Sequence, residues 1–184
     1  LLSSIMRVYI REPQISDVKE FVEKNRASLK MHRPWVFPAT TLAAFRSYIE
    51  CLSSPRYAGF FICRKEDDAI VGTVNLSEII LGPMKGAFVG YWLYHGSEGQ
   101  GYMTEGLSLV FDYAFDVLGL HRLEVNIQPT NTESIALVNR IGLRKEGFSP
   151  KYLKIGGEWR DHERWALLAE EWKSRDDGLG SLGG

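Results

Sequence analysis

Three glycines stand close together near the middle of the chain, in the stretch YHGSEGQGYMTEG. The run before them, AFVGYWLYH, is rich in β-branched and aromatic residues, and residues 107–118 repeat apolar side chains at helical spacing. A second β-rich run, HRLEVNIQ, follows. Strand, helix and strand in this order predict a crossover between two parallel strands.

The segments around this crossover predict mainly antiparallel pairing, because short polar turns join neighbouring β-rich runs. Strands are predicted at residues 7–12, 57–65, 69–80, 87–95, 121–128, 147–155 and 158–169, and helices at 16–29, 41–52, 107–118 and 132–141. The expected fold is α+β: a mixed, mostly antiparallel sheet of about seven strands with about four helices and one central parallel crossover.

The composition is that of one ordinary globular domain, with 184 residues, 45% of them hydrophobic, and a net charge of −1. We expect a single domain over residues 6–174 and a flexible glycine-rich tail over 175–184. The near-neutral charge argues against nucleic acid or an anionic membrane as partner. With no apolar run approaching the roughly 18 residues of a membrane helix, we expect a cytoplasmic protein.

The two cysteines, Cys51 and Cys63, lie in different predicted elements, and neither has a cysteine or histidine at metal-ligand spacing. We therefore expect reduced thiols and no metal site.

The glycine turn has the character of an anion site. A strand that runs through glycines directly into a helix leaves backbone N–H groups unpaired at the positive end of the helix dipole. Gly99 and Gly101 let a phosphate approach without a Cβ in the way, and Thr104 adds a hydroxyl. Pyrophosphate fits this arrangement better than a single carboxylate. The alternative is a plain strand-to-helix connection.

Three other motifs compete for this turn. A P-loop requires lysine and Ser/Thr after its last glycine, where Tyr102 and Met103 stand. A dinucleotide fingerprint requires glycine at position 104 and an early parallel crossover, whereas a meander comes first here. A serine-hydrolase elbow would use Ser97, but His95 occupies the position of its first glycine.

The segments GYW, EGQGYMTEGL and NTESIALVNRIGLRKEGF resemble the GNAT family of acetyl-CoA-dependent N-acetyltransferases, and within it the Rim-type (RimJ/RimL-like) ribosomal-protein-alanine acetyltransferases. The resemblance runs from about Arg7 to Trp172, including REPQISDV and GGEWRDHERWALLAEEW. It implies the GNAT fold, acetyl-CoA as co-substrate and acetylation of a primary amine, with a protein or peptide N-terminus as the expected acceptor.

In this family the turn that binds the pyrophosphate has the sequence pattern Gln/Arg-x-x-Gly-x-Gly/Ala. Here those positions are Glu98, Gly99, Gln100, Gly101, Tyr102 and Met103. Gly101 is the strict match, Glu98 departs from the Gln/Arg preference, and methionine at 103 is similar to a Rim-type variant.

The resemblance also implies roles for residues outside the turn. The backbone of Tyr91, Trp92 and Leu93 would lie near the acetyl group, in the gap between two splayed strands. Asn131 would contact the pantetheine arm, and Ser134 would protonate the departing thiolate as general acid. The alternative is that Asn131 caps the next helix and Ser134 packs in its first turn.

The general base is open. The positions that carry glutamate in relatives hold Phe88 and Leu153 here. Water relayed by Glu124, Asn126 or Gln128 is one route, with Glu124 as a base candidate. His95 and His121 are weaker candidates, because a lone histidine is more often structural.

The acceptor cleft is expected between HRPWVFP and the last hairpin. Trp35 and Phe37 would line it, with Glu158, Asp161 or Glu163 attracting an ammonium group. The alternative is that these aromatics fill the core. Two other functions stay open: a coenzyme A binding module without turnover, and acetylation of a small amine such as an antibiotic or polyamine. The protein is expected to be a monomer or homodimer.

Overall fold

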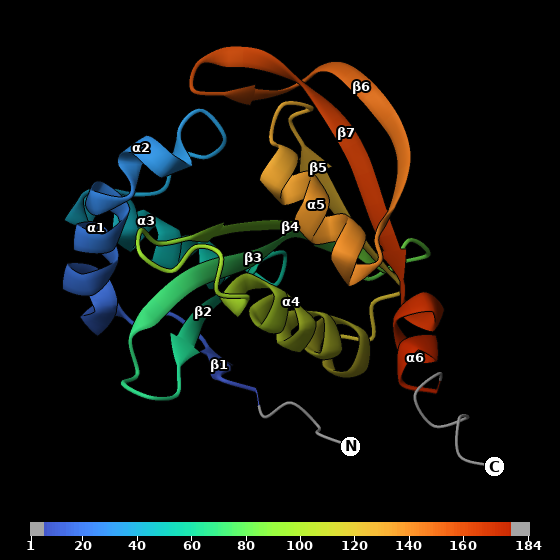
Figure 1. Ribbon diagram of the computed structural model, residues 1–184, viewed down its shortest axis with the longest axis horizontal. Coiled ribbons are helices and arrows are strands. Elements are labelled where there is room, and N and C mark those ends of the chain that lie inside the picture. The colour runs from blue at the N-terminus through green and yellow to red at the C-terminus, as the bar shows by residue number, and fades with distance from the viewer. Residues whose placement is uncertain (1–5, 178–184) are drawn as a thin grey trace.

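The computed structural model describes residues 6–177 and is drawn in Figure 1. The strands are β1 (Val8–Arg11), β2 (Ala58–Arg64), β3 (Ile70–Ile80), β4 (Gly86–Leu93), β5 (Arg122–Ile127), β6 (Arg144–Ile155) and β7 (Glu158–Leu168). The helices are α1 (Val18–Ala27), α2 (Leu29–His32), α3 (Leu42–Leu52), α4 (Tyr102–Asp112), α5 (Thr132–Ile141) and α6 (Ala169–Asp177), with a short 3-10 turn at Ile15–Asp17 and a π-helical turn at Tyr113–Val117.

The seven strands form one sheet in the order β1-β2-β3-β4-β5-β7-β6. Within the described residues, β4 and β5 are the single parallel pair, and α4 makes the crossover between them. The predicted α+β fold, seven strands and central crossover are confirmed. Helices α2 and α6 were not predicted. Four residues are too few to show a helical period, and α6 is strongly polar in sequence.

Helix α6 continues through residues 175–177, which the sequence assigned to the tail. The remainder of the predicted tail, residues 178–184, lies outside the described residues.

Helices cover both faces of the sheet. One face packs against α4 and α5 in the larger core cluster, which includes Leu107, Val110 and Leu123. The other face packs against α1 and α3 in a second cluster around Phe21 and Phe45. Figure 1 shows α1, α2 and α3 grouped at one end and α5 beneath the long β6–β7 hairpin. The middle of the sheet is thus held from both sides.

The two parallel strands separate part of the way along β4. Paired positions stop at Phe88 and Glu124, although β4 continues to Leu93. The Tyr94 N–H donates to the Val71 C=O at 3.1 Å, so the adjacent pair Leu93–Gly72 is a non-hydrogen-bonded position of the β3–β4 ladder. By alternation, the backbone polar groups of Tyr91 also point away from β3, toward the opening.

Candidate functional site

The glycine turn has the backbone conformation that its sequence suggested. Gly96, Gly99 and Gly101 have φ angles of 87°, 70° and 82°, in the left-handed region that disfavours other residues. A Cβ atom added at Gly96 or Gly99 would meet no atom within 4 Å. The turn is therefore open to an approaching ligand, and Gly101 is the N-cap residue of α4.

Backbone donors converge at this turn. No residue of the described chain accepts a hydrogen bond from the backbone N–H groups of residues 99–104, whereas the next one, Glu105 N–H, donates to the Gly101 C=O at 3.1 Å. These donors lie at the positive end of α4. Such a set of free N–H groups fits a pyrophosphate, which supplies several acceptor oxygens.

Arg7, just before the edge strand β1, links the turn to the sheet through hydrogen bonds. Its Nη2 donates to the Gln100 C=O at 2.7 Å, and its backbone N–H and Nε donate to the two oxygens of Glu105, each at 2.7 Å. The Arg7 guanidinium also lies over the ring of Tyr102, 5.0 Å from its centroid. The sequence reasoning missed Arg7, because an arginine at a strand start gives no signal of a partner about one hundred residues away.

Most side chains of the turn stabilise its backbone conformation. Tyr102 and Met103 are buried in the larger core cluster, and Thr104 is half-buried. Glu98 accepts the Gly96 N–H at 2.6 Å, and Gln100 Nε2 donates to the Gly96 C=O at 2.9 Å. Among the residues predicted to bind the cofactor at this turn, the groups that remain free to face a ligand are therefore backbone groups and the Thr104 hydroxyl.

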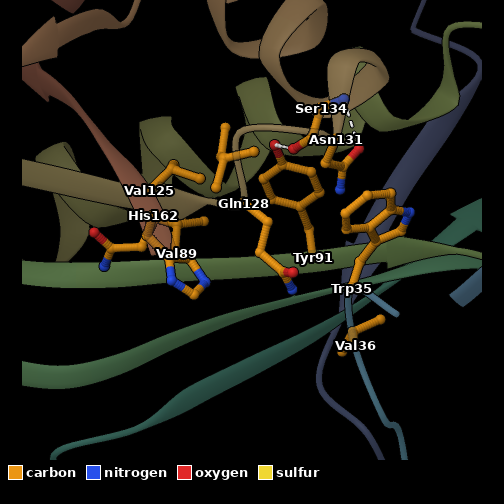
Figure 2. Close-up of a pocket in the computed structure, with 11 residues that line it drawn as sticks. Trp35, Val36, Val89, Tyr91, Val125, Gln128, Asn131, Ser134 and His162 are labelled. Carbon is orange, nitrogen blue, oxygen red and sulfur yellow. Dashed lines mark hydrogen bonds between the residues drawn. The ribbon is translucent and has the colours of Figure 1, made fainter. Parts of the chain in front are cut away.

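A cavity of about 90 Å³ lies where β4 and β5 separate, and Figure 2 shows its walls. It is lined by Trp35, Val36, Val89, Tyr91, Val125, Asn126, Ile127, Gln128, Asn131, Ser134 and His162. The wall is neutral, since it consists of apolar groups, amides, hydroxyls and one imidazole. It brings together the predicted site residues Trp35, Tyr91, Asn131 and Ser134. Asn126 and Gln128, named from the sequence as possible water relays, line it as well.

Two hydroxyls meet at the α5 side of this cavity. The Tyr91 hydroxyl and Ser134 Oγ are 2.6 Å apart (Figure 2). Burial raises the pKa of Tyr91 to about 12, and the hydrogen bond with Ser134 opposes that shift. Asn131 Oδ1 accepts the Ser134 N–H at 3.2 Å, so Asn131 does cap α5. Capping leaves the Ser134 hydroxyl free to pair with Tyr91.

The other two predicted residues of β4 are less available to a ligand. The Leu93 C=O accepts a hydrogen bond from His32 Nε2 at 2.7 Å, and burial lowers the pKa of His32. Trp92 lies opposite Thr73 and packs against the cluster on the α1 and α3 face. Of the three residues predicted near the acetyl group, Tyr91 and Leu93 both turn their backbone groups away from β3, but the Leu93 C=O is already bound by His32.

The opposite wall carries amides and a histidine. Gln128 Nε2 donates to the Pro34 C=O at 3.3 Å, which ties the loop after α2 over the cavity. Asn126 Oδ1 is buried without a hydrogen-bond partner among the described residues. His162 on β7 is 3% exposed. The sequence reasoning overlooked His162. The available signal was the alternation of side chains along β7, which puts His162 and Trp165 on opposite faces of the strand.

The predicted acceptor segments do meet. The ring of Phe37 lies against Gly156 in the β6–β7 turn, where an added Cβ would be 2.6 Å from Phe37 Cζ. The nearby carboxylates are already paired: Glu158 with Arg160 at 2.6 Å, Glu163 with Lys145 at 2.5 Å, and Asp161 with the backbone N–H of Lys151 at 2.7 Å. None of them lines the cavity.

The base candidates lie outside the cavity wall. Glu124 accepts a hydrogen bond from Arg122 Nε at 2.6 Å, His95 lies 3.4 Å from Glu98, and His121 lies 3.1 Å from Glu170. The apolar positions are likewise outside it: Phe88 is half-buried, and Leu153 is exposed.

Two other features are absent from the described residues. Among residues 6–177, no three or more His, Cys, Asp or Glu side chains gather where they could hold a metal ion. The helices within the same range are too short or too polar to cross a membrane.

Comparison with known proteins agrees with this geometry. Residues 7–144 match the model of the acetyltransferase (GNAT) domain family. The chain is 42% identical over 121 residues to the probable N-acetyltransferase YjcK of Bacillus subtilis, covering 66% of this chain and 67% of that protein. It is 34% identical over 116 residues to the [ribosomal protein uS5]-alanine N-acetyltransferase of Escherichia coli, covering 63% of this chain and 59% of that enzyme.

Among solved structures, Mycobacterium smegmatis RimJ in complex with CoA-disulfide superimposes with a TM-score of 0.84 at 28% identity, over 94% of this chain and 89% of that one. The free N–H groups of the glycine turn suit the pyrophosphate of coenzyme A, and the open edge of β4 suits the amides of its pantetheine arm. The chain belongs to the GNAT family of acetyl-CoA-dependent N-acetyltransferases.

Proposed function

We propose that this enzyme transfers the acetyl group of acetyl-CoA to the α-amine at the N-terminus of a protein or peptide, by direct attack in a ternary complex. The observation that carries the proposal is the neutral cavity at the opening between β4 and β5, with a hydroxyl pair on one wall and amides on the other. The similarity to the uS5-alanine enzyme supports the same acceptor class.

The donor would bind along the turn and the open strand edge. In this proposal the N–H groups of residues 99–104 hold the pyrophosphate, with Glu98 and Gln100 shaping the turn and Tyr102 and Met103 anchoring it in the core. The free backbone of Tyr91 pairs with the pantetheine arm beside Asn131. The thioester then lies at the cavity, next to the two hydroxyls.

The hydroxyl pair would assist departure of the sulfur. A thiolate with a pKa near 8.5 leaves more readily when a nearby group donates a hydrogen bond or a proton to it. Ser134 and Tyr91 share one hydrogen bond, so either hydroxyl can donate toward the sulfur while the other supports it. We assign Ser134 as the general acid, with Tyr91 as its partner.

The neutral wall favours an α-amine over a strongly basic amine. At pH 7.5 about a third of an α-amine with pKa near 7.8 is uncharged, compared with about 0.1% of a lysine side chain. A neutral amine enters a cavity without carboxylates at little desolvation cost, whereas a polyamine cation there would lack a counter-charge. Asn126 Oδ1, buried and without a partner, is placed to accept an N–H of the incoming amine.

Trp35 and Phe37 would contact the residues that follow the acceptor N-terminus. Trp35 lines the cavity, and Phe37 lies outside it against the β6–β7 turn, near Glu158. An extended peptide leaving the cavity would pass between these two segments.

Release of coenzyme A thiol tests the proposal with three matched acceptors. The first is a lysine-free peptide that begins with alanine, the second is the same peptide with a blocked N-terminus and one internal lysine, and the third is spermidine. We expect turnover with the first and at least 100-fold lower kcat/KM with the other two, and mass spectrometry should locate the acetyl group on the α-nitrogen. Preferential acetylation of spermidine or of the internal lysine would refute the α-amine assignment.

A further inference from the structure

His162 is a buried ionisable group that faces the cavity. It is 3% exposed. Ile127 of β5 pairs with Glu163 of β7, so the next position in the antiparallel register places His162 beside Gln128. Figure 2 shows its imidazole across the cavity from the Tyr91 and Ser134 hydroxyls.

The hydrogen bonding of the ring fixes which of its two nitrogens is free to act as a base. His162 Nδ1 lies 2.9 Å from the Arg160 C=O. Because a carbonyl oxygen can only accept, Nδ1 must carry the proton, and neutral His162 therefore has its lone pair on Nε2. The Arg160 C=O of the same strand thus orients the imidazole ring. In other catalytic sites a third group orients the histidine that acts as a base in the same way.

The surroundings keep this imidazole uncharged at neutral pH. Burial lowers the pKa of His162 below its usual value of about 6.5, while the Arg160 C=O and the charge of Asp161 act against that shift. Across the hairpin, the Tyr152 ring lies 6.2 Å away in an edge-on arrangement. The β5 neighbours Asn126 and Gln128 are neutral amides.

The two walls lie on opposite faces of the sheet. Tyr91 packs against the core cluster that contains α4 and α5, as do Val125, Ile127 and Trp165. The alternating residues Asn126 and Gln128, with His162 beside them, therefore point to the other face. A thioester in the opening would have hydroxyls on the side of its sulfur and an imidazole lone pair on the side from which an amine arrives.

We propose that Nε2 of His162 is the general base that accepts the proton of the acceptor amine, an inference that rests on the proposed acetyl transfer. The amine nitrogen forms its bond to the acetyl carbon while the C–S bond breaks and the sulfur leaves with the electron pair. One N–H proton passes to Nε2, and the sulfur takes a proton from the Ser134–Tyr91 pair. The proton on His162 returns through solvent to that pair, so the sum is amine plus thioester giving amide plus thiol.

Positions 88 and 153, where the family resemblance leads one to expect a glutamate, hold Phe88 and Leu153. The imidazole supplies a proton acceptor from β7 instead. His162 has the neutral form that base catalysis needs.

The test compares His162→Gln with His121→Gln, using the alanine peptide that the wild-type enzyme acetylates. His121 is an exposed histidine paired with Glu170, away from the cavity, and serves as the matched control. We expect kcat to fall at least 100-fold in His162→Gln, with KM for acetyl-CoA within threefold of wild type, and to stay within twofold in His121→Gln. A His162→Gln enzyme that folds, binds coenzyme A and keeps its kcat would overturn the base assignment and leave the proposed function standing.

Two further measurements separate proton transfer from packing. In His162→Ala, added imidazole should raise kcat at least tenfold above its value without imidazole. The same concentration of imidazole should leave the kcat of the wild-type enzyme unchanged. Absence of rescue in a folded variant counts against His162 as the base. In the wild-type enzyme, the acid limb of kcat against pH should match the His162 pKa titrated by NMR of histidine-labelled protein. The groups that could shift this limb are Asp161, Arg160, Tyr152 and Tyr91. A mismatch would overturn the proposal even if both variants failed to fold, and a wild-type enzyme that acetylates no amine would refute the proposed function itself.

Discussion

The two halves of β4 differ in both pairing and charge. Residues Gly86–Phe88 pair with β5, and an ion network lies beside that closed end: Arg122 binds Glu124 and Glu146, and Arg144 binds Glu146 and Glu171. Residues Val89–Leu93 leave β5, and the cavity beside them is neutral. Charges thus occur where strands are held together, and uncharged donors and acceptors where the reaction would take place.

The difference has a physical reason. Partly exposed ion pairs cost little desolvation and can join neighbouring strands, although each contributes only modestly. A carboxylate buried in the small opening would need a partner or would become protonated. Hydroxyls, amides and a neutral imidazole avoid this cost and can still move a proton. The comparison predicts large effects on rate at the open half and small effects on stability at the closed half.

Among changes that compare the two halves of β4, the largest effect is expected for the hydroxyl pair. Ser134→Ala should lower kcat by about 100-fold, in the range typical of a lost general acid, and should cost about 1 kcal/mol of unfolding free energy because the Tyr91 hydroxyl loses its partner. The double variant Tyr91→Phe/Ser134→Ala should recover much of that stability and remain as inactive as the single variant, since no buried hydroxyl is left unpaired.

Steady-state kinetics and urea unfolding check both expectations. Ser108→Ala is the matched control, because its hydroxyl donates to the Thr104 C=O within α4, away from the cavity. Turnover by Ser134→Ala within threefold of wild type would remove Ser134 as the acid.

An intermediate effect is expected at the glycine turn. In Gly101→Ala a methyl group is forced into a left-handed residue with φ of 82° and lies 3.2 Å from Arg7 Nη2. We expect a loss of about 1–2 kcal/mol of stability and about tenfold weaker coenzyme A binding, because the turn must distort. Calorimetric titration measures the affinity. Gly82→Ala is the control, since an added Cβ there meets no atom within 4 Å; equal affinities in the two variants would contradict the backbone-cradle interpretation.

The smallest effect is expected at the closed end. Hydrogen bonding from Arg122 holds the pKa of Glu146 below its usual range, with a smaller contribution from Arg144 and with burial opposing both. A lowered folded-state pKa stabilises the protein above the unfolded pKa of about 4.3, and this contribution is lost as the pH falls through the folded value.

Glu146→Gln should therefore cost about 0.5–1 kcal/mol of unfolding free energy at pH 7 and progressively less below pH 4.3, with turnover at pH 7 unchanged. Urea unfolding at pH 7 and at pH 3.5 measures the change. A gap between wild type and variant that is equal at both pH values would show that the ion pair does not contribute in this way.

Sequence reasoning worked best where the relevant contacts are local. The glycine turn, the capping of α5 by Asn131 and the parallel crossover all follow from spacing within a few dozen residues, and the structure has each of them. It worked less well for Glu124 even though its partner is near in the chain: Arg122 lies two residues away on the same face of β5, and alternation alone does not show that the two side chains pair. Arg7 and His162 were missed because their partners are brought to them by sheet pairing and by closure of the chain over the cavity.

The order of strands and helices, with glycines where the backbone needs positive φ, was determined by the sequence itself, because dihedral preference and hydrophobic period are properties of short segments. The pairing of Tyr91 with Ser134, the neutral cavity and the turning of His162 toward it were decided only by the tertiary structure. Each depends on where β4 leaves β5, and that point is set by packing between segments far apart in the chain, which no local pattern records.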